Sequence, residues 1–235
     1  MATQYAFGKI VTNGLVLSLD AADKNSYPGS GATWNDLTQN LYTASLVNTP
    51  TFLNTNGGTL EFRDSSFQYG DTNKNIGGLT NWTVEAWTRI GASLTGKVTT
   101  IVCNQYDLVS NLNFSIGTNN APITYNLVVG FFNGAWRNTT GHVPPLNTWF
   151  QVVGTYDGNT INQYHNGSLT SSLSYTGTST SGGTIRLARR WDDVANIQSN
   201  MYSGSVSIVR IYNRSLTNSE IQQNYNAQKS RFGLT

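Results

Sequence analysis

Two tryptophans in the sequence stand beside arginine, amide and carboxylate residues. Trp136 is followed by Arg137 and Asn138, and Trp191 lies within the run of residues 189–193, which reads RRWDD. An indole ring can stack on the C–H face of a sugar, while planar amides, carboxylates and guanidinium groups bond the hydroxyls. We therefore predict a glycan contact made by Trp136, Arg137, Arg189, Trp191, Asp192 and Tyr202, with Tyr69 as a further wall.

Both tryptophans also have a structural interpretation. A loop tryptophan can fold back and anchor its loop on the fold, and the sequence favours neither role over the other. The stretch that carries Trp191 separates two predicted strands, Gly183–Ala188 and Met201–Tyr212, by more residues than a hairpin needs. The remaining tryptophans are expected in the core: Trp34, Trp82, Trp87 and Trp149.

Glutamate is too scarce to favour glycoside hydrolysis. The chain has only Glu61, Glu85 and Glu220. A retaining glycosidase needs two carboxyl groups about 5 Å apart, and none of the three has a second carboxylate at strand spacing. The neighbours Asp192 and Asp193 would point to opposite faces of a strand. Polysaccharide cleavage is therefore the less favoured function.

Nucleophilic catalysis has equally little support. His142 lies in a loop that ends in two prolines, and His165 lies beside the Asn166-Gly167 pair. A triad assembled from two histidines in a serine-rich chain carries little weight. The single cysteine, Cys103, follows apolar residues and is expected to be a small buried hydrophobic residue.

The composition restricts the partners. The 235 residues are 38% hydrophobic and only 11% charged, with a net charge of +2, against about 25% charged in an average soluble domain. No basic cluster extends beyond Arg189-Arg190, which argues against a nucleic-acid partner. No apolar stretch reaches the length of a membrane span, and residues 1–4 lack the pattern of a secretion signal. We expect neither membrane insertion nor nucleic-acid binding.

Short strands separated by turn residues are predicted along the whole chain. Asn166-Gly167 is the preferred pair for a type I′ hairpin. About a dozen strands at regular spacing is the pattern of a sandwich or a barrel. The predicted strands cover residues 14–20, 58–62, 82–90, 99–104, 111–116, 125–132, 149–156, 160–165, 168–173, 183–188 and 201–212.

One helix is predicted, at residues 217–228. Thr217 and Glu220 have the spacing of a capping box, in which each side chain bonds the other residue's backbone N–H. Leu216 before the cap and Ile221 after it can form a hydrophobic staple. Ile221 and Tyr225 share one helical face, so we expect them to dock the helix onto the strands.

Several of these segments resemble one known family. The run from Gly204 to Ile221, with VRIYNR followed by LTNSEI, looks like the end of a laminin G-like, concanavalin A-like jelly-roll domain. Trp82–Ile90 resembles the family's F-T-V-x-A-W strand, and Trp149–Gly158 resembles its W-x-x-V-x-x-T-Y-D-G segment. The opening Ile10–Leu37 and the closing Gln223–Leu234 resemble versions of this domain in marine and cyanobacterial phage proteins.

The resemblance implies an all-β fold, an antiparallel jelly-roll β-sandwich of the concanavalin A-like type with one short C-terminal helix. It implies a single domain over residues 1–235, in which residues 1–14 form an N-terminal arm or first strand. Laminin G-like domains often bind calcium through aspartate oxygens. Here Arg63 and Phe67 stand at positions that are acidic in the phage-type versions. We therefore expect no cofactor; the weak candidates for calcium, or else loop caps, are Asp20, Asp23 and Asp36.

The resemblance also implies a bacteriophage virion protein, on the capsid or a tail fibre, assembled in the host cytoplasm and then exposed on the virion surface. Two functions remain open, because fold does not decide function. The first is non-enzymatic, lectin-like adhesion to host or environmental polysaccharide. The second is decoration or assembly with other virion proteins and no small ligand. A homo-oligomer is compatible with both.

Overall fold

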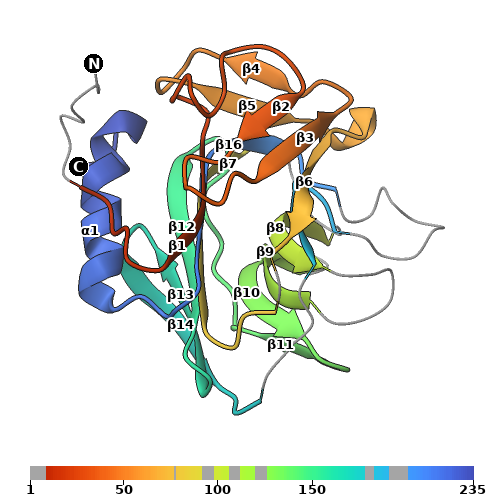
Figure 1. Cartoon of the computed structure of the whole chain (residues 1–235). Helices are drawn as coiled ribbons and strands as arrows, with labels where there is room; N and C mark the ends of the chain where they lie inside the picture. Colours follow the sequence, from red (N-terminus) through yellow and green to blue (C-terminus); the bar gives the residue numbers. More distant parts are fainter. Residues whose placement is uncertain are drawn as a thin grey trace.

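The chain forms two antiparallel β-sheets that face each other, with one helix on the outside of the first sheet (Figure 1). The computed structural model describes residues 9–76, 78–91, 98–105, 112–119, 126–177, 183–190 and 201–235. Within these residues the predicted all-β sandwich with one short C-terminal helix is confirmed. No helix in these ranges is long and apolar enough to cross a membrane.

Sheet A has the strand order β14-β13-β12-β7-β16-β5-β4. Strand β1 also pairs with β16, along the half that β5 leaves open. The long β16 therefore lies inside the sheet. The strands of sheet A are β1 (Leu15–Asp20), β4 (Thr51–Leu53), β5 (Thr59–Phe62), β7 (Trp82–Ile90), β12 (Trp149–Tyr156), β13 (Thr160–His165), β14 (Ser168–Ser174) and β16 (Gly204–Tyr212).

Sheet B has the strand order β11-β10-β9-β8-β15-β6-β3-β2. The chain passes repeatedly between the two sheets, as in a jelly roll; β6 and β7, for example, are consecutive but lie in different sheets. The strands of sheet B are β2 (Thr33–Asn35), β3 (Thr43–Val47), β6 (Tyr69–Asn75), β8 (Thr99–Gln105), β9 (Leu112–Asn119), β10 (Asn126–Phe132), β11 (Trp136–Asn138) and β15 (Thr184–Leu187).

Alternation along the strands fills the space between the sheets. In β7, Trp82, Val84 and Ala86 lie in the core between the sheets, while Trp87 packs with Phe232 on the opposite face of sheet A. Both faces of this strand are therefore buried, although only the core face is mainly apolar. The predicted core positions of Trp34, Trp82 and Trp87 are confirmed, and Trp149 is half-buried against Phe232.

Helix α1 (Asn218–Gln228) begins where the sequence predicts. Thr217 and Glu220 form the capping box in both directions. Leu216 and Ile221 lie in one buried cluster, and the ring of Tyr225 stacks on Trp87 at 5.8 Å between centroids. The docking through Ile221 and Tyr225 is thus confirmed. A 3-10 turn, η3 (Lys229–Phe232), continues the helix across sheet A.

Several elements differ from the prediction. The strands β2, β3, β4, β6 and β11 were not predicted, because they are short or, like β6, rich in residues that are uncommon in strands. Strand β16 begins at Gly204 rather than at Met201. Of the two alternatives predicted for the N-terminal segment, the described residues 9–14 follow the arm: they form no strand, and the N–H of Val11 donates to Asn224 Oδ1 at 2.8 Å. A short 3-10 turn, η1 (Asp64–Ser66), follows β5.

The capping box makes the stability of the fold depend on pH. Hydrogen bonds from Arg214, and then from Thr217, lower the pKa of Glu220 from 4.5 to about 2. A carboxylate with a depressed pKa stabilises the folded state above its unfolded pKa and loses that effect as the pH falls toward its folded pKa. Glu220→Gln should therefore have a lower free energy of unfolding than the wild type at neutral pH. The difference should be only about 1 kcal/mol, because the cap is half-exposed and solvent weakens its charge interactions. Urea titrations should show this gap constant above pH 5 and closing between pH 4.5 and 2. A gap that does not change with pH would contradict the assignment.

Candidate functional site

The outer face of sheet B carries the residues best suited to bind a ligand. Side chains alternate along a strand, so a residue between two core positions points outward. Ser115, for example, lies between Phe114 and Ile116, which are both buried in the core. Cross-strand pairing lines up such positions in one row across the sheet, formed by Asp71, Arg186, Cys103, Ser115, Gly130 and Asn138.

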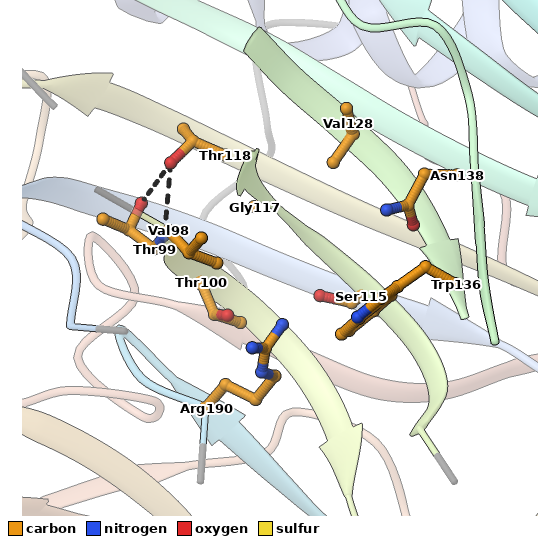
Figure 2. A pocket seen from close by; sticks show the side chains of 10 residues that line it. All are labelled: Val98, Thr99, Thr100, Ser115, Gly117, Thr118, Val128, Trp136, Asn138 and Arg190. Atoms are coloured by element: carbon orange, nitrogen blue, oxygen red, sulfur yellow. Dashed lines mark hydrogen bonds between the residues drawn. The ribbon is translucent and has the colours of Figure 1, made fainter. Parts of the chain in front are cut away.

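A hollow of about 190 Å³ opens on this face, and we call it the Trp136 hollow. Gly117 lies among its lining residues and cannot be replaced by a larger residue, since a Cβ there would lie 2.2 Å from the carbonyl oxygen of Thr99 in the neighbouring strand. Small hydroxyl-bearing side chains surround this glycine. Figure 2 shows the full lining, which consists of Val98, Thr99, Thr100, Ser115, Gly117, Thr118, Val128, Trp136, Asn138 and Arg190.

Trp136 is the aromatic residue of the hollow, and 40% of its surface is exposed. The guanidinium carbon of Arg190 lies 4.6 Å from the centroid of its ring, a cation–π contact. The ring of Phe132 packs edge-on at 5.3 Å. Asn138 stands two residues further along β11 and so shares the outer face. The hollow therefore combines an indole, a guanidinium group, an amide and several hydroxyls (Figure 2).

The structure separates Trp136 from Arg137. Both residues lie on strand β11, not on a loop as the sequence suggested. Neighbouring residues of a strand point to opposite faces. Arg137 accordingly places its guanidinium carbon 4.5 Å from the ring centroid of Tyr175, which packs against the core. Arg137 is therefore not part of the Trp136 hollow.

Arg189 and Tyr202 are buried, which corrects the prediction that they contact a glycan. Arg189 forms an ion pair with Asp71, and its guanidinium lies 3.5 Å from the ring centroid of Tyr69. Tyr202 is fully buried, with its hydroxyl 2.7 Å from Thr88 Oγ1. Neither offers a surface to a ligand in this conformation, and Tyr69 is covered by Arg189. Trp191 and Asp192 lie outside the described residues, so their proposed role stays a prediction.

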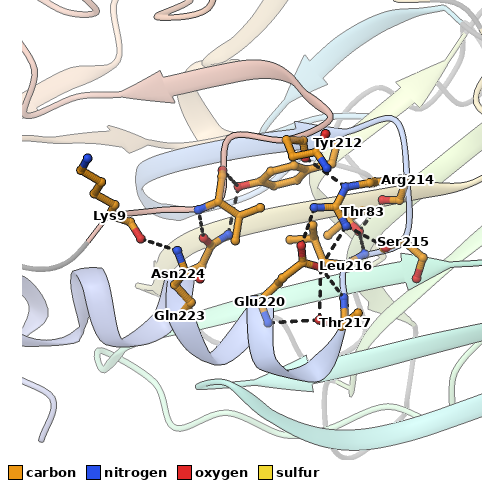
Figure 3. Close-up of polar contacts among 12 residues, drawn as sticks. Lys9, Thr83, Tyr212, Arg214, Ser215, Leu216, Thr217, Glu220, Gln223 and Asn224 are labelled. Carbon is orange, nitrogen blue, oxygen red and sulfur yellow. Dashed lines mark hydrogen bonds and ion pairs between the residues drawn. The ribbon is translucent and has the colours of Figure 1, made fainter.

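The glutamates are all engaged in structural contacts. Glu61 pairs with Arg63 at 2.9 Å, and Glu85 is completely buried in sheet A. Glu220 closes the helix cap and pairs with Arg214 at 2.5 Å (Figure 3). Among these glutamates the structure shows no pair of carboxyl groups that would suit glycoside hydrolysis.

The two histidines, which the sequence places apart, lie together. The rings of His142 and His165 are 4.3 Å apart between centroids, and Phe150 packs on His165. Burial, and secondly the neighbouring His142, lower the pKa of His165 to about 4, so it is neutral at neutral pH. Burial likewise raises the pKa of the Cys103 thiol to about 12, which leaves the thiol without nucleophilic character. The predicted burial of Cys103 is confirmed.

The aspartates considered for calcium act as loop caps. Asp20 pairs with Arg231 at 2.8 Å, which neutralises its charge. Asp36 accepts the N–H groups of Ser18 and Thr38, and Asp23 accepts that of Asn25. No cluster of three or more metal-ligating side chains occurs in the described ranges.

Sequence reasoning missed most of the lining of the Trp136 hollow. Arg190 was noted only as part of a charged run, and Thr100 and Ser115 were not considered. A signal was present for Ser115, since it stands between two apolar residues of a predicted strand. Asn138 follows Trp136 by two residues and would share its face once β11 is recognised as a strand.

Comparisons with known proteins agree with this architecture. A family model described as "Concanavalin A-like lectin/glucanases superfamily" matches residues 54–222. No curated protein sequence matches the chain.

Solved structures with the same fold share little sequence with this chain. Domain 4 of AbnA, an extracellular GH43 arabinanase from Geobacillus stearothermophilus, solved in complex with arabinotriose, has a TM-score of 0.66 and 15% identity, over 90% of this chain and 98% of that one. The binding domain of botulinum neurotoxin DC, in complex with SialylT, has a TM-score of 0.67 and 16% identity, over 92% and 51% of the two chains. The binding domain of Paraclostridial Mosquitocidal Protein 1 has a TM-score of 0.67 and 16% identity, over 94% of this chain and 55% of that one. This chain thus spans about half the length of the two toxin domains.

Proposed function

Because the chain belongs to the concanavalin A-like lectin/glucanase superfamily, we propose that it binds carbohydrate through the Trp136 hollow and does not cleave it. The observation that carries this proposal is the 40% exposed indole of Trp136 in a hollow that also holds an amide and a guanidinium group. A sugar ring has an apolar C–H face and a rim of hydroxyls. The hollow offers a partner for each of them.

Each lining residue has a defined part in this proposal. The indole of Trp136 supplies the apolar surface for a sugar ring. The amide of Asn138 both donates and accepts hydrogen bonds. Thr100 and Ser115 are buried, so they shape the hollow from below. Arg190 keeps the indole in one orientation through the cation–π contact. Two structures with the same fold were solved in complex with arabinotriose and with SialylT. These complexes support a carbohydrate ligand for this chain.

Trp136→Ala tests the site directly. We expect the variant to lose at least about tenfold in affinity for any glycan that the wild type binds, because an aromatic anchor carries much of the binding energy of a small site. Its melting temperature should hardly change, since the side chain is 40% exposed. A glycan array followed by calorimetry gives both values. Leu169→Ala, an exposed apolar residue on β14 of the other sheet, is the control and should bind like the wild type.

The same experiment separates the two functions left open by the sequence. If the wild type binds no glycan on a broad array, the adhesion proposal fails and the assembly function becomes the better one. If the Leu169→Ala control loses binding as strongly as Trp136→Ala, the Trp136 hollow is not the site.

The proposal excludes glycoside hydrolysis. It is supported by the engagement of Glu61, Glu85 and Glu220 in the contacts described above. We expect no release of reducing ends from bacterial or algal polysaccharides over prolonged incubation. Release that is abolished by Glu61→Gln, a change at a half-exposed glutamate, would overturn this part of the proposal.

A narrower proposal is that the protein is displayed on a bacteriophage virion, as a capsid decoration or fibre subunit, where it attaches the particle to polysaccharide. Its support is the similarity of the opening and closing segments to phage-type versions of the domain. Antibodies against the recombinant protein should label intact virions of the encoding phage in electron micrographs, at the capsid or at the fibres. Labelling of the host cell lysate without labelling of the virions would contradict it.

A further inference from the structure

A second hollow lies on a different part of the molecule. It has a volume of about 280 Å³ and opens between the loop that follows β1 and the loop that joins β4 to β5. We call it the Lys24 hollow. Its lining shares no residue with the Trp136 hollow and consists of Ala21, Ala22, Lys24, Tyr27, Pro28, Gly29, Phe52, Asn54 and Gly57.

Hydrogen bonds hold both walls in place. In the first loop, the N–H of Tyr27 donates to the carbonyl of Asp23 at 2.7 Å, and its hydroxyl donates to the carbonyl of Gly31 at 2.9 Å. In the second loop, Asn56 and Arg231 exchange two hydrogen bonds, of 2.8 and 2.6 Å, which tie the loop to the turn after the helix. The hollow is therefore preformed, and binding a ligand does not cost the conformational entropy of ordering its loops.

The base of the hollow is apolar. The rings of Tyr27 and Phe52 lie 5.5 Å apart between centroids at an angle of 43°, and Pro28 stands beside them. Tyr27 is buried, whereas Phe52 is half-buried and keeps part of its ring open. Gly29 and Gly57 both have positive φ angles and leave the walls without side chains. This surface matches the C–H face of one sugar ring.

The rim carries a single formal charge, the ammonium group of Lys24, together with the amide of Asn54. The nearby Asp23 does not line the hollow, and its carboxylate accepts bonds from the N–H and the side-chain amide of Asn25. Behind Gly57, the positive charge of Arg231 is paired with Asp20. Asp23 keeps its charge, but Lys24 is the charged residue that lines the hollow itself, and its ammonium group favours an anionic group on the ligand.

We propose that the Lys24 hollow is a second carbohydrate subsite that takes one sugar ring bearing a carboxylate, of the uronic acid type. Its volume lies near the lower end of ligand pockets, at about 300 Å³, which suits one ring rather than a long oligosaccharide. The subsite is independent of the Trp136 hollow. Two subsites on one rigid chain would raise the avidity for an acidic polysaccharide without any new contact at either one.

Glucuronate and glucose form a matched pair of probes, since they differ only at C6, which is a carboxylate in the first and a hydroxymethyl group in the second. The titration is followed by NMR on the Trp136→Ala variant, so that binding at the first hollow does not contribute. We expect saturable shifts of the backbone amides of Lys24, Phe52 and Asn54 with glucuronate, and at least threefold weaker binding of glucose. Failure of the function proposed for the Trp136 hollow leaves this result unaffected.

Three variants test the charge and the apolar base. Lys24→Gln should weaken glucuronate binding about threefold and leave glucose binding unchanged, because only the charge pair is lost. Asn54→Asp, at an exposed position, should weaken the binding of glucuronate by a similar factor, because the two carboxylates repel each other. Phe52→Leu should weaken the binding of both sugars while the chain stays folded. Lys74→Gln removes an exposed lysine of β6 and is the control that should change nothing.

Two results would overturn the proposal. The first is an absence of saturable shifts at these amides with glucuronate at tens of millimolar. The second is equal binding of glucose and glucuronate together with no effect of Lys24→Gln, which would remove the assignment of an acidic sugar.

Discussion

The buried carboxylate of Glu85 is the constraint on which sheet A and its helix depend. It is completely buried and accepts hydrogen bonds from Trp87 Nε1 at 3.1 Å, Gln151 Nε2 at 2.9 Å, Arg210 Nη1 at 3.2 Å and Asn224 Nδ2 at 2.9 Å. These donors come from β7, β12, β16 and α1. A buried charge that loses a partner costs about 3–5 kcal/mol, so the three strands and the helix are held in one arrangement.

This arrangement determines which surfaces are left for function. One face of sheet A packs on the core. Helix α1 and the turn after it cover the centre of the other face, where the ring centroids of Phe232 and Trp87 lie 4.4 Å apart. In the described part of the chain, sheet B has no such helical cover on its outer face. The Trp136 hollow lies there, and the Lys24 hollow lies between loops. The polar network under the helix is therefore structural, although its residue types resemble those of a ligand site.

The sequence predicted what depends on local physics. The helix start followed from Thr217 and Glu220 alone, and the alternation of β7 followed from its own residues. It did not predict the burial of Tyr202, whose partner Thr88 is 114 residues away, or that of Arg189, whose partner Asp71 is 118 residues away. Strand β11 has only three residues, too few to show a period, and so Trp136 was assigned to a loop. Hollows formed by loops distant in sequence leave no local pattern at all.

The inner position of β16 has a consequence for how the protein is made. This strand follows all other described strands of sheet A in the sequence, yet it pairs with β7 on one side and with β1 and β5 on the other. A ribosome therefore releases every other strand of sheet A before the one that joins them. Until then β1 and β5 have no partner in the middle of the sheet, and their edges stay open to wrong pairing. Pairing within sheet A should be slow, because its decisive contacts join residues almost 200 positions apart, such as Leu17 and Ile211.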